Sequence, residues 1–239
     1  MGKFLVEQEN EVFLVAPETE QSGMSSAITY LRPLMAKSIK TRILEDSFVD
    51  GCMVNGTPVD CVRLALSELC PWKPDLVLSG INDGLNAGTN VNYSGTVAAA
   101  MTAASLSCPA MAISVESSVN PQYRSVIESA LPIIKKLIKN PLPKGVFTNL
   151  NFPTAAIKDG PNFEYLIVPS ETNPMGYEFA KGTDPKNRKY FWATNSPPPE
   201  PSEFMTDTQA LKAGNITLTA LSSNLNDDSG RQLIRDLLE

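Results

Sequence analysis

Polar residues and glycines gather between an apolar run and a run of small helix-forming residues near the middle of the chain. Residues 75–101 read DLVLSGINDGLNAGTNVNYSGTVAAAM. A buried strand that leads into a polar, Gly-rich loop and then into a helix is typical of a ligand site at the carboxyl edge of a parallel α/β sheet. Free amides at the start of such a helix attract anions. The segment therefore predicts a site for a small anionic ligand, with chemistry performed on it.

Asn82 follows the predicted strand directly, where its side-chain oxygen would face the crevice. An amide oxygen is a suitable ligand for a hard cation such as Mg²⁺. The alternative is a turn asparagine that bonds its own backbone, and the neighbouring Asp83 is equally ambiguous. Spacing alone leaves both interpretations open.

The end of the loop, Tyr93-Ser94-Gly95-Thr96, carries a stronger indication. Ser94 or Thr96 can cap the following helix, and Gly95 lets the backbone come close to a ligand. A capped helix without a ligand is the alternative. Ser22, in the loop after the first strand, would lie at the same edge of the sheet, unless that loop is only a solvated connection.

Composition narrows the class of function. The net charge of −6 and the pI near 4.9 argue against a nucleic-acid or anionic-membrane surface, so a bound phosphate must be held locally. The absence of histidine excludes a Ser-His-Asp triad, a phosphohistidine and imidazole-bound zinc. The four cysteines lack CxxC spacing and are expected to be small apolar residues in a reducing compartment. With no apolar run of about 20 residues and no basic–apolar leader pattern at the N-terminus, we expect a cytoplasmic protein without a membrane segment.

Strand and helix patterns alternate over the first 152 residues, which predicts a mostly parallel sheet with helices on both faces. We expect strands at 12–16, 75–79, 110–115 and 146–152. We expect helices beginning at Thr57-Pro58, at about Thr96 and around 126–138, the last despite Pro132 near its middle.

Beyond residue 152 the alternation stops. Strand-like runs at 163–168 and 189–194 are separated by a loop marked by Gly and Pro, which predicts a protruding hairpin arm over 161–213. Exposed aromatic residues on such an arm would need a partner, so we expect it to pair subunits into a homodimer or homotetramer. A strand at 216–221 and a helix at 231–238 return to the body, which comprises 1–160 and 214–239.

Four motifs occur in order along the chain: VAPETEQSGMSSAIT (15–29), NGTPVDCV (55–62), PDLVLSGINDGLNAGTNVNYSGTVAAAM (74–101) and FTNLNFP (147–153). Together they resemble one known family, the SurE survival-protein phosphatases. The resemblance implies an α/β fold, a Rossmann-like three-layer sandwich with a mostly parallel sheet and a C-terminal β-hairpin arm. It also implies a metal-dependent phosphomonoester hydrolase, a 5′-nucleotidase acting on nucleoside 5′-monophosphates.

The resemblance also implies roles for single residues. Ser22 and Asn82 match metal ligands for one Mg²⁺ or Mn²⁺ per subunit, and Asn82 and Ser94 match catalytic positions. The residues expected on the phosphate or substrate side are Ser94, Gly95, Thr96, Gly80 and Asn86.

One part of the family pattern has no counterpart here. The family begins with a central strand and an Asn-Asp-Asp-Gly turn whose two aspartates are the remaining metal ligands, whereas Met1 to Leu5 match the end of the helix after that turn. We therefore expect native residues before Met1; a chain that repacks its sheet is the alternative. A catalytically inactive, N-terminally truncated nucleotide-binding or scaffold protein of the same fold is the rival to the enzyme.

Overall fold

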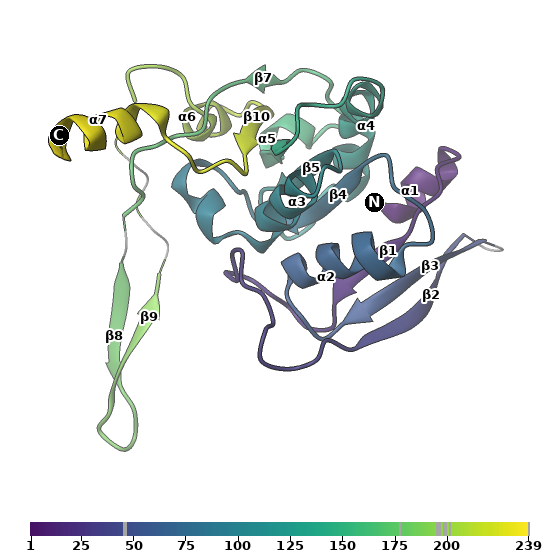
Figure 1. Cartoon of the computed structure of the whole chain (residues 1–239), viewed down its shortest axis with the longest axis horizontal. Helices are drawn as coiled ribbons and strands as arrows, with labels where there is room; N and C mark the ends of the chain where they lie inside the picture. Colours follow the sequence, from purple (N-terminus) through teal and green to yellow (C-terminus); the bar gives the residue numbers. More distant parts are fainter. Residues whose placement is uncertain (45–46, 177, 195–196, 198–199, 201, 239) are drawn as a thin grey trace.

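The computed structural model describes residues 1–44, 47–176, 178–194, 197, 200 and 202–238. It contains a five-stranded sheet in the order β4-β5-β6-β10-β7, a three-stranded sheet in the order β1-β3-β2, and the two-stranded hairpin β8-β9 (Figure 1). The strands are β1 (Leu14–Pro17), β2 (Ala36–Leu44), β3 (Ser47–Val54), β4 (Val77–Asp83), β5 (Ala110–Val115), β6 (Val146–Phe152), β7 (Leu166–Ile167), β8 (Phe179–Thr183), β9 (Lys189–Ala193) and β10 (Thr217–Ser222).

The helices are α1 (Gly2–Glu7), α2 (Pro58–Leu64), α3 (Gly95–Ser105), α4 (Tyr123–Lys139), α5 (Thr154–Ile157), α6 (Asp207–Lys212) and α7 (Asp228–Leu238). A π-helical turn at 65–69 extends α2, and a 3₁₀ segment at 88–93 leads into α3. Among the described residues, no helix is long and apolar enough to cross a membrane.

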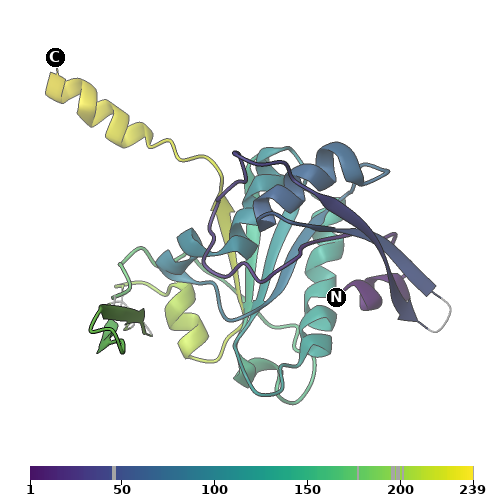
Figure 2. The ribbon, with the colours of Figure 1, turned by 90° about the horizontal axis from the view of Figure 1, so that it is seen from below.

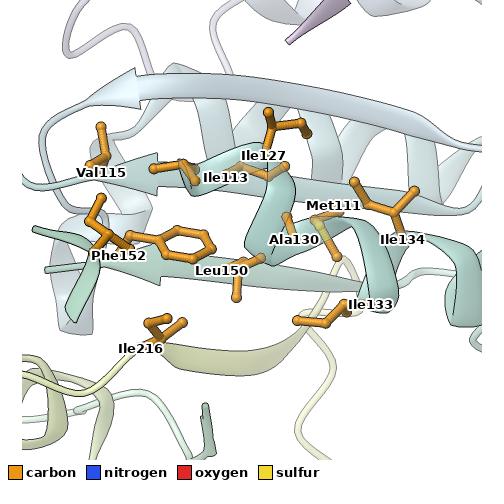
Figure 3. Close-up of a cluster of buried hydrophobic side chains, with 12 residues drawn as sticks. Met111, Ile113, Val115, Ile127, Ala130, Ile133, Ile134, Leu150, Phe152 and Ile216 are labelled. Carbon is orange, nitrogen blue, oxygen red and sulfur yellow. The ribbon is translucent and has the colours of Figure 1, made fainter. Parts of the chain in front are cut away.

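Two helices cover opposite faces of the main sheet because side chains alternate along a strand. On β5, Met111 and Ile113 point toward α4 and pack with Val126 and Ile134 in a cluster that also includes Leu150 (Figure 3). The intervening alanines of β5 meet α3, which is itself rich in alanine. The layered α/β architecture expected from the sequence is confirmed.

A capping box begins α2, as the Thr57-Pro58 pair predicts. The Thr57 hydroxyl oxygen accepts a hydrogen bond from the Asp60 amide at 3.1 Å, and the Asp60 carboxylate accepts one from the Thr57 amide at 3.0 Å. Two helix-terminal donors are thereby satisfied. Pro132 stays inside α4, also as predicted.

The strand predictions for 110–115 and 146–152 agree with β5 and β6 to the residue. The first strand begins two residues later than expected, at Leu14. Strand β4 also begins two residues late and extends to Asp83, so Asn82 lies within it and does not follow it. The register shifts between Ser79 and Asn82, and this irregularity hid the end of the strand in the sequence pattern.

The arm is shorter than the predicted range 161–213. Leu166–Ile167 pairs in parallel with β10 in the main sheet, and α6 packs against β10, so both belong to the body. The hairpin is formed by β8 and β9, and not by the run at 163–168 (Figure 1). The sequence suggested the wrong partner because β7 is apolar but makes only two ladder pairs.

The first sheet and the main sheet are separate. Strand β1 is an edge of one, β4 is an edge of the other, and no ladder joins them in the described part of the chain. The views in Figures 1 and 2 show α1 and α2 beside this gap. The chain has therefore not repacked into one continuous sheet.

Candidate functional site

Three chain segments meet at the start of α3. Asn82, near the carboxyl end of β4, accepts a hydrogen bond through its Oδ1 atom from the Thr96 hydroxyl at 3.2 Å. Its Nδ2 atom donates to the carbonyl oxygen of Gly84 at 2.7 Å. The Asn82 side chain therefore bonds nearby backbone, as a turn asparagine does, and it also links the end of β4 to the first turn of α3.

The loop that carries Ser22 is held against the same place. The Ser25 hydroxyl donates to the carbonyl oxygen of Asn92 at 2.6 Å, and the Ser25 amide donates to that of Tyr93 at 3.1 Å. Asp60 accepts the Thr29 amide at 3.0 Å, so the capping box of α2 also anchors this loop. The exposed Ser22 hydroxyl donates to the carboxylate of Glu20 at 2.8 Å.

Gly95 lies where the Ser22 loop and α2 come close to the start of α3. A Cβ atom at Gly95 would lie 3.0 Å from Cγ of Pro58 and 3.4 Å from the carbonyl oxygen of Gln21. A side chain there would crowd Pro58 at the start of α2 and the backbone of the Ser22 loop. Ser22, Asn82 and Ser94 therefore lie on segments that converge, as their placement in the sequence predicts.

The first turn of α3 offers an anion site. Ser94 is the N-cap, and its Oγ atom accepts a hydrogen bond from the Val97 amide at 3.2 Å. The amides of Gly95 and Thr96 precede Val97, where a helix supplies no internal acceptor. These two amides and the positive end of the helix dipole can bind phosphate oxygens, while the Ser94 hydroxyl keeps its proton for donation.

Asn86 has a structural role in addition to the substrate contact predicted for it. It is buried, and its Nδ2 atom donates to the Ser114 hydroxyl at 2.8 Å. Its amide donates to Oδ1 of Asn151, and its carbonyl oxygen accepts hydrogen bonds from Asn149 and Asn151. These bonds position the loop, and the predicted contact of Asn86 with substrate stays a prediction.

Gly80 also has a packing role that the sequence did not reveal. A Cβ atom there would collide with the carbonyl oxygen of Ile113 on β5, and its φ of +123° favours glycine. The glycine permits the irregular stretch of β4 before Asn82. Its predicted contact with substrate stays a prediction.

The base of the arm is tied to the loop that precedes Ser94. The buried Asp207 carboxylate accepts hydrogen bonds from the Gly88 amide at 3.0 Å, the Ser170 hydroxyl at 3.1 Å and the Glu171 amide at 2.9 Å. It also accepts the Thr208 amide at 2.8 Å. Asp207 therefore fixes the 3₁₀ segment at 88–93 against the body.

Beside Asp207, Glu171 is only 2% exposed. Burial alone would raise the pKa of this carboxyl group, but hydrogen bonds from the Asn173 amide and from the Ser202 and Thr206 hydroxyls outweigh burial. The pKa of Glu171 consequently lies below its ordinary value of 4.5. A carboxylate with a lowered pKa stabilises the fold above its unfolded pKa, and this contribution is lost as the pH falls through the folded value.

We expect Glu171→Gln to lower the free energy of unfolding at pH 7 and to flatten its decline below about pH 4.5. Urea titrations between pH 7 and pH 3 measure this dependence. Glu203→Gln, at an exposed position of the same region, is the matched control and should keep the wild-type slope. An unchanged slope in Glu171→Gln would contradict the assigned pKa direction.

The two predicted metal ligands, Ser22 and Asn82, are themselves uncharged. Divalent cations such as Mg²⁺ need several oxygen ligands, normally including carboxylates. Ser22 and Asn82 offer neutral oxygens, and Oδ1 of Asn82 already accepts the Thr96 hydroxyl. In the ranges that the structure describes, no group of three or more acidic, cysteine or histidine side chains could hold a metal ion. These residues alone do not fit a divalent cation.

Comparison with known proteins identifies the family. The sequence model of the family described as "Survival protein SurE" matches residues 2–168. The chain belongs to the SurE family. A relative from Rhodopirellula baltica named "5′-nucleotidase SurE" is 42% identical over 219 residues, covering 91% of this chain and 84% of that protein. "5′-nucleotidase SurE 1" from Thermus thermophilus is 35% identical, with 96% and 88% of the two chains covered.

A solved SurE structure supports the fold assignment. The crystal structure of the SurE protein from Aquifex aeolicus superimposes with a TM-score of 0.76 at 27% identity, covering 99% of this chain and 92% of that one. The expected fold class, a Rossmann-like α/β architecture with a mostly parallel sheet, is thereby confirmed.

Several residues around the site escaped the sequence analysis. Asn149 and Asn151 alternate with apolar residues in a buried strand, and this alternation could have indicated a buried polar network under the loop. Asp207 and Glu171 had no such indication, because their partners lie far away in sequence.

Proposed function

We propose that this SurE-family chain is a phosphomonoester hydrolase, specifically a 5′-nucleotidase that releases phosphate from nucleoside 5′-monophosphates. The observation that carries the proposal is the convergence of the Ser22 loop, Asn82 and the Ser94-capped start of α3. The relatives named 5′-nucleotidase support the reaction class.

The site residues have separate roles in binding and positioning the phosphate group. The amides of Gly95 and Thr96 hold phosphate oxygens at the positive end of α3, and the Ser94 hydroxyl donates to a third oxygen. Asn82 holds the Thr96 hydroxyl beside the end of β4 through a hydrogen bond. Phosphoryl transfer depends mainly on positioning and charge stabilisation, which such a cradle of donors supplies.

Phosphate release from AMP and from p-nitrophenyl phosphate tests the proposal, with Mg²⁺ or Mn²⁺ present and with both removed by a chelator. Turnover supports the hydrolase, and its loss on chelation supports the predicted metal dependence. Binding of AMP without turnover under every condition would overturn the enzyme in favour of an inactive nucleotide-binding scaffold. The named relatives give that alternative no support.

We also propose that the hairpin of β8 and β9 joins subunits into a homodimer or homotetramer. Its aromatic side chains are solvent-exposed, with Trp192 69% and Phe191 60% accessible, and Figure 1 shows the hairpin projecting from the body. Exposed apolar groups of this size are typical of a surface that pairs with another protein.

Replacing residues 179–193 with a short Gly/Ser linker is expected to halve or quarter the apparent mass on gel filtration with light scattering. The buried contacts of Glu171 and Asp207 remain outside the deleted range, so the body keeps its fold. Circular dichroism checks that it does. An unchanged mass would exclude the hairpin from assembly.

A further inference from the structure

A group of polar side chains lies inside the fold, on the face of the main sheet that packs against α3. Asn149 of β6 is opposite Thr219 of β10, and Thr217 lies two residues away on the same face. Phe147, also on this face, packs with the core cluster of α3. The three polar side chains are at most 1% exposed. Because bulk water does not reach them, their polar atoms need partners within the fold.

Three oxygen atoms of this group have no hydrogen-bond partner in the part of the chain that the structure describes. They are Oδ1 of Asn149 and the hydroxyl oxygens of Thr217 and Thr219. A buried polar atom without a partner destabilises the fold, and folded proteins contain few such atoms. Three of them at neighbouring positions indicate that they share a ligand that is not a protein side chain.

The chemistry of these oxygens selects the ligand. Oδ1 of Asn149 can only accept a hydrogen bond, whereas each threonine hydroxyl has one proton to donate. A ligand that satisfies all of them must therefore donate one hydrogen bond and accept two. A water molecule does both, and internal waters typically make about three hydrogen bonds. A monovalent cation would leave both hydroxyl protons without an acceptor.

We propose that Asn149, Thr217 and Thr219 bind an ordered internal water molecule between β6 and β10. Side chains directly opposite each other in an antiparallel pair have Cβ atoms about 4.5–5.5 Å apart, and diagonal neighbours lie within about 8 Å. Their polar atoms are thus close enough for one water molecule to bridge them. This site is independent of the proposed hydrolase activity.

The internal water fixes the orientation of the Asn149 side chain. Oδ1 of Asn149 faces the water, so Nδ2 is directed to the carbonyl oxygen of Asn86, to which it donates at 2.8 Å. Asn86 belongs to the loop that leads from β4 toward the start of α3. The water therefore supports this loop through Asn149.

A high-resolution crystal structure of the full chain tests the assignment directly. We expect a water oxygen about 2.5–3.0 Å from Oδ1 of Asn149 and from both threonine hydroxyl oxygens. A direct hydrogen bond from Thr219 to Asn149 would overturn the proposal. A cation coordinated by these oxygens, or no density between them, would overturn it as well.

A pair of isosteric substitutions tests the same site in solution. Thr219→Val removes a hydroxyl and keeps the branched shape, and it should raise the equilibrium constant for unfolding about tenfold, because the water and Asn149 lose a partner. Thr148→Val is the matched control. The Thr148 hydroxyl also has no partner among the described residues, but it lies on the opposite face beside Met111 of the apolar α4 cluster. Its removal should leave the unfolding constant unchanged or lower it. Equal effects of the two substitutions in urea titrations would contradict the proposal.

The double variant Thr217→Val/Thr219→Val checks that one water serves both hydroxyls. Its increase in the unfolding constant should be smaller than the product of the two single increases, because the first substitution already weakens the binding of the shared water. Amide exchange at Asn86 should be faster in both single variants. Fully multiplicative effects, with unchanged exchange at Asn86, would place the two hydroxyls on separate partners and overturn the shared site.

Discussion

Asn82→Ala is expected to lower phosphate release from AMP by about 100-fold or more. The substitution removes the acceptor of the Thr96 hydroxyl and the donor to the Gly84 carbonyl oxygen, so the end of β4 separates from the phosphate cradle. Misplacing a group of a preorganised site by about 1 Å can cost about 100-fold in turnover. Steady-state kinetics at saturating substrate measure the effect.

Asn140→Ala is the matched control for Asn82→Ala. Asn140 is an exposed asparagine at the end of α4 whose Nδ2 atom donates to a carbonyl oxygen of its own helix at 3.3 Å, far from the site in the fold. Its turnover should equal that of the wild type. Wild-type turnover in Asn82→Ala itself would remove Asn82 from the site.

Asp207→Ala is expected to lower the free energy of unfolding by about 3 kcal/mol, because buried donors left without an acceptor each cost roughly 1–3 kcal/mol and some find water. Four donors lose their acceptor, among them the Gly88 amide and the Ser170 hydroxyl. Urea unfolding at pH 7 provides the measurement.

Asp159 is exposed and serves as the control position. The free energy of unfolding of Asp159→Ala should stay within about 0.5 kcal/mol of the wild-type value. The folded fraction of Asp207→Ala should also show faster amide exchange over 88–93, since the 3₁₀ segment loses its anchor. Equal free energies of unfolding for the two variants would show that the hydrogen bonds of Asp207 do not stabilise the fold.

Local chemistry made much of the site predictable. Helix caps and strand patterns depend on residues only a few positions apart. The sequence therefore indicated the caps at Thr57-Pro58 and Ser94 and the apolar strands of the core. Asn82 was placed beside the helix start correctly, although it lies inside β4. Its true position depends on the irregular stretch after Ser79, which no spacing rule indicates.

Contacts between residues far apart in the sequence could not be predicted from it. The buried network of Asn86 with Asn149 and Asn151, and the bonds from Asp207 to Gly88 and Glu171, join residues separated by 36 to 119 positions. Separations of this kind are fixed by packing of the whole chain and not by local propensity. The hairpin was paired wrongly for a different reason: β8 is close to β9 in the sequence, but it has little apolar character to indicate a strand.

The central claim is that phosphate binds at the start of α3. Titration of ¹⁵N-labelled protein with inorganic phosphate, and separately with AMP, tests it directly by NMR and needs no turnover. We predict saturable shifts of the Gly95 and Thr96 amides with both ligands, and smaller shifts at Asn82. Saturable shifts confined to other segments, with the amides of 94–97 unmoved, would contradict the assignment of this site.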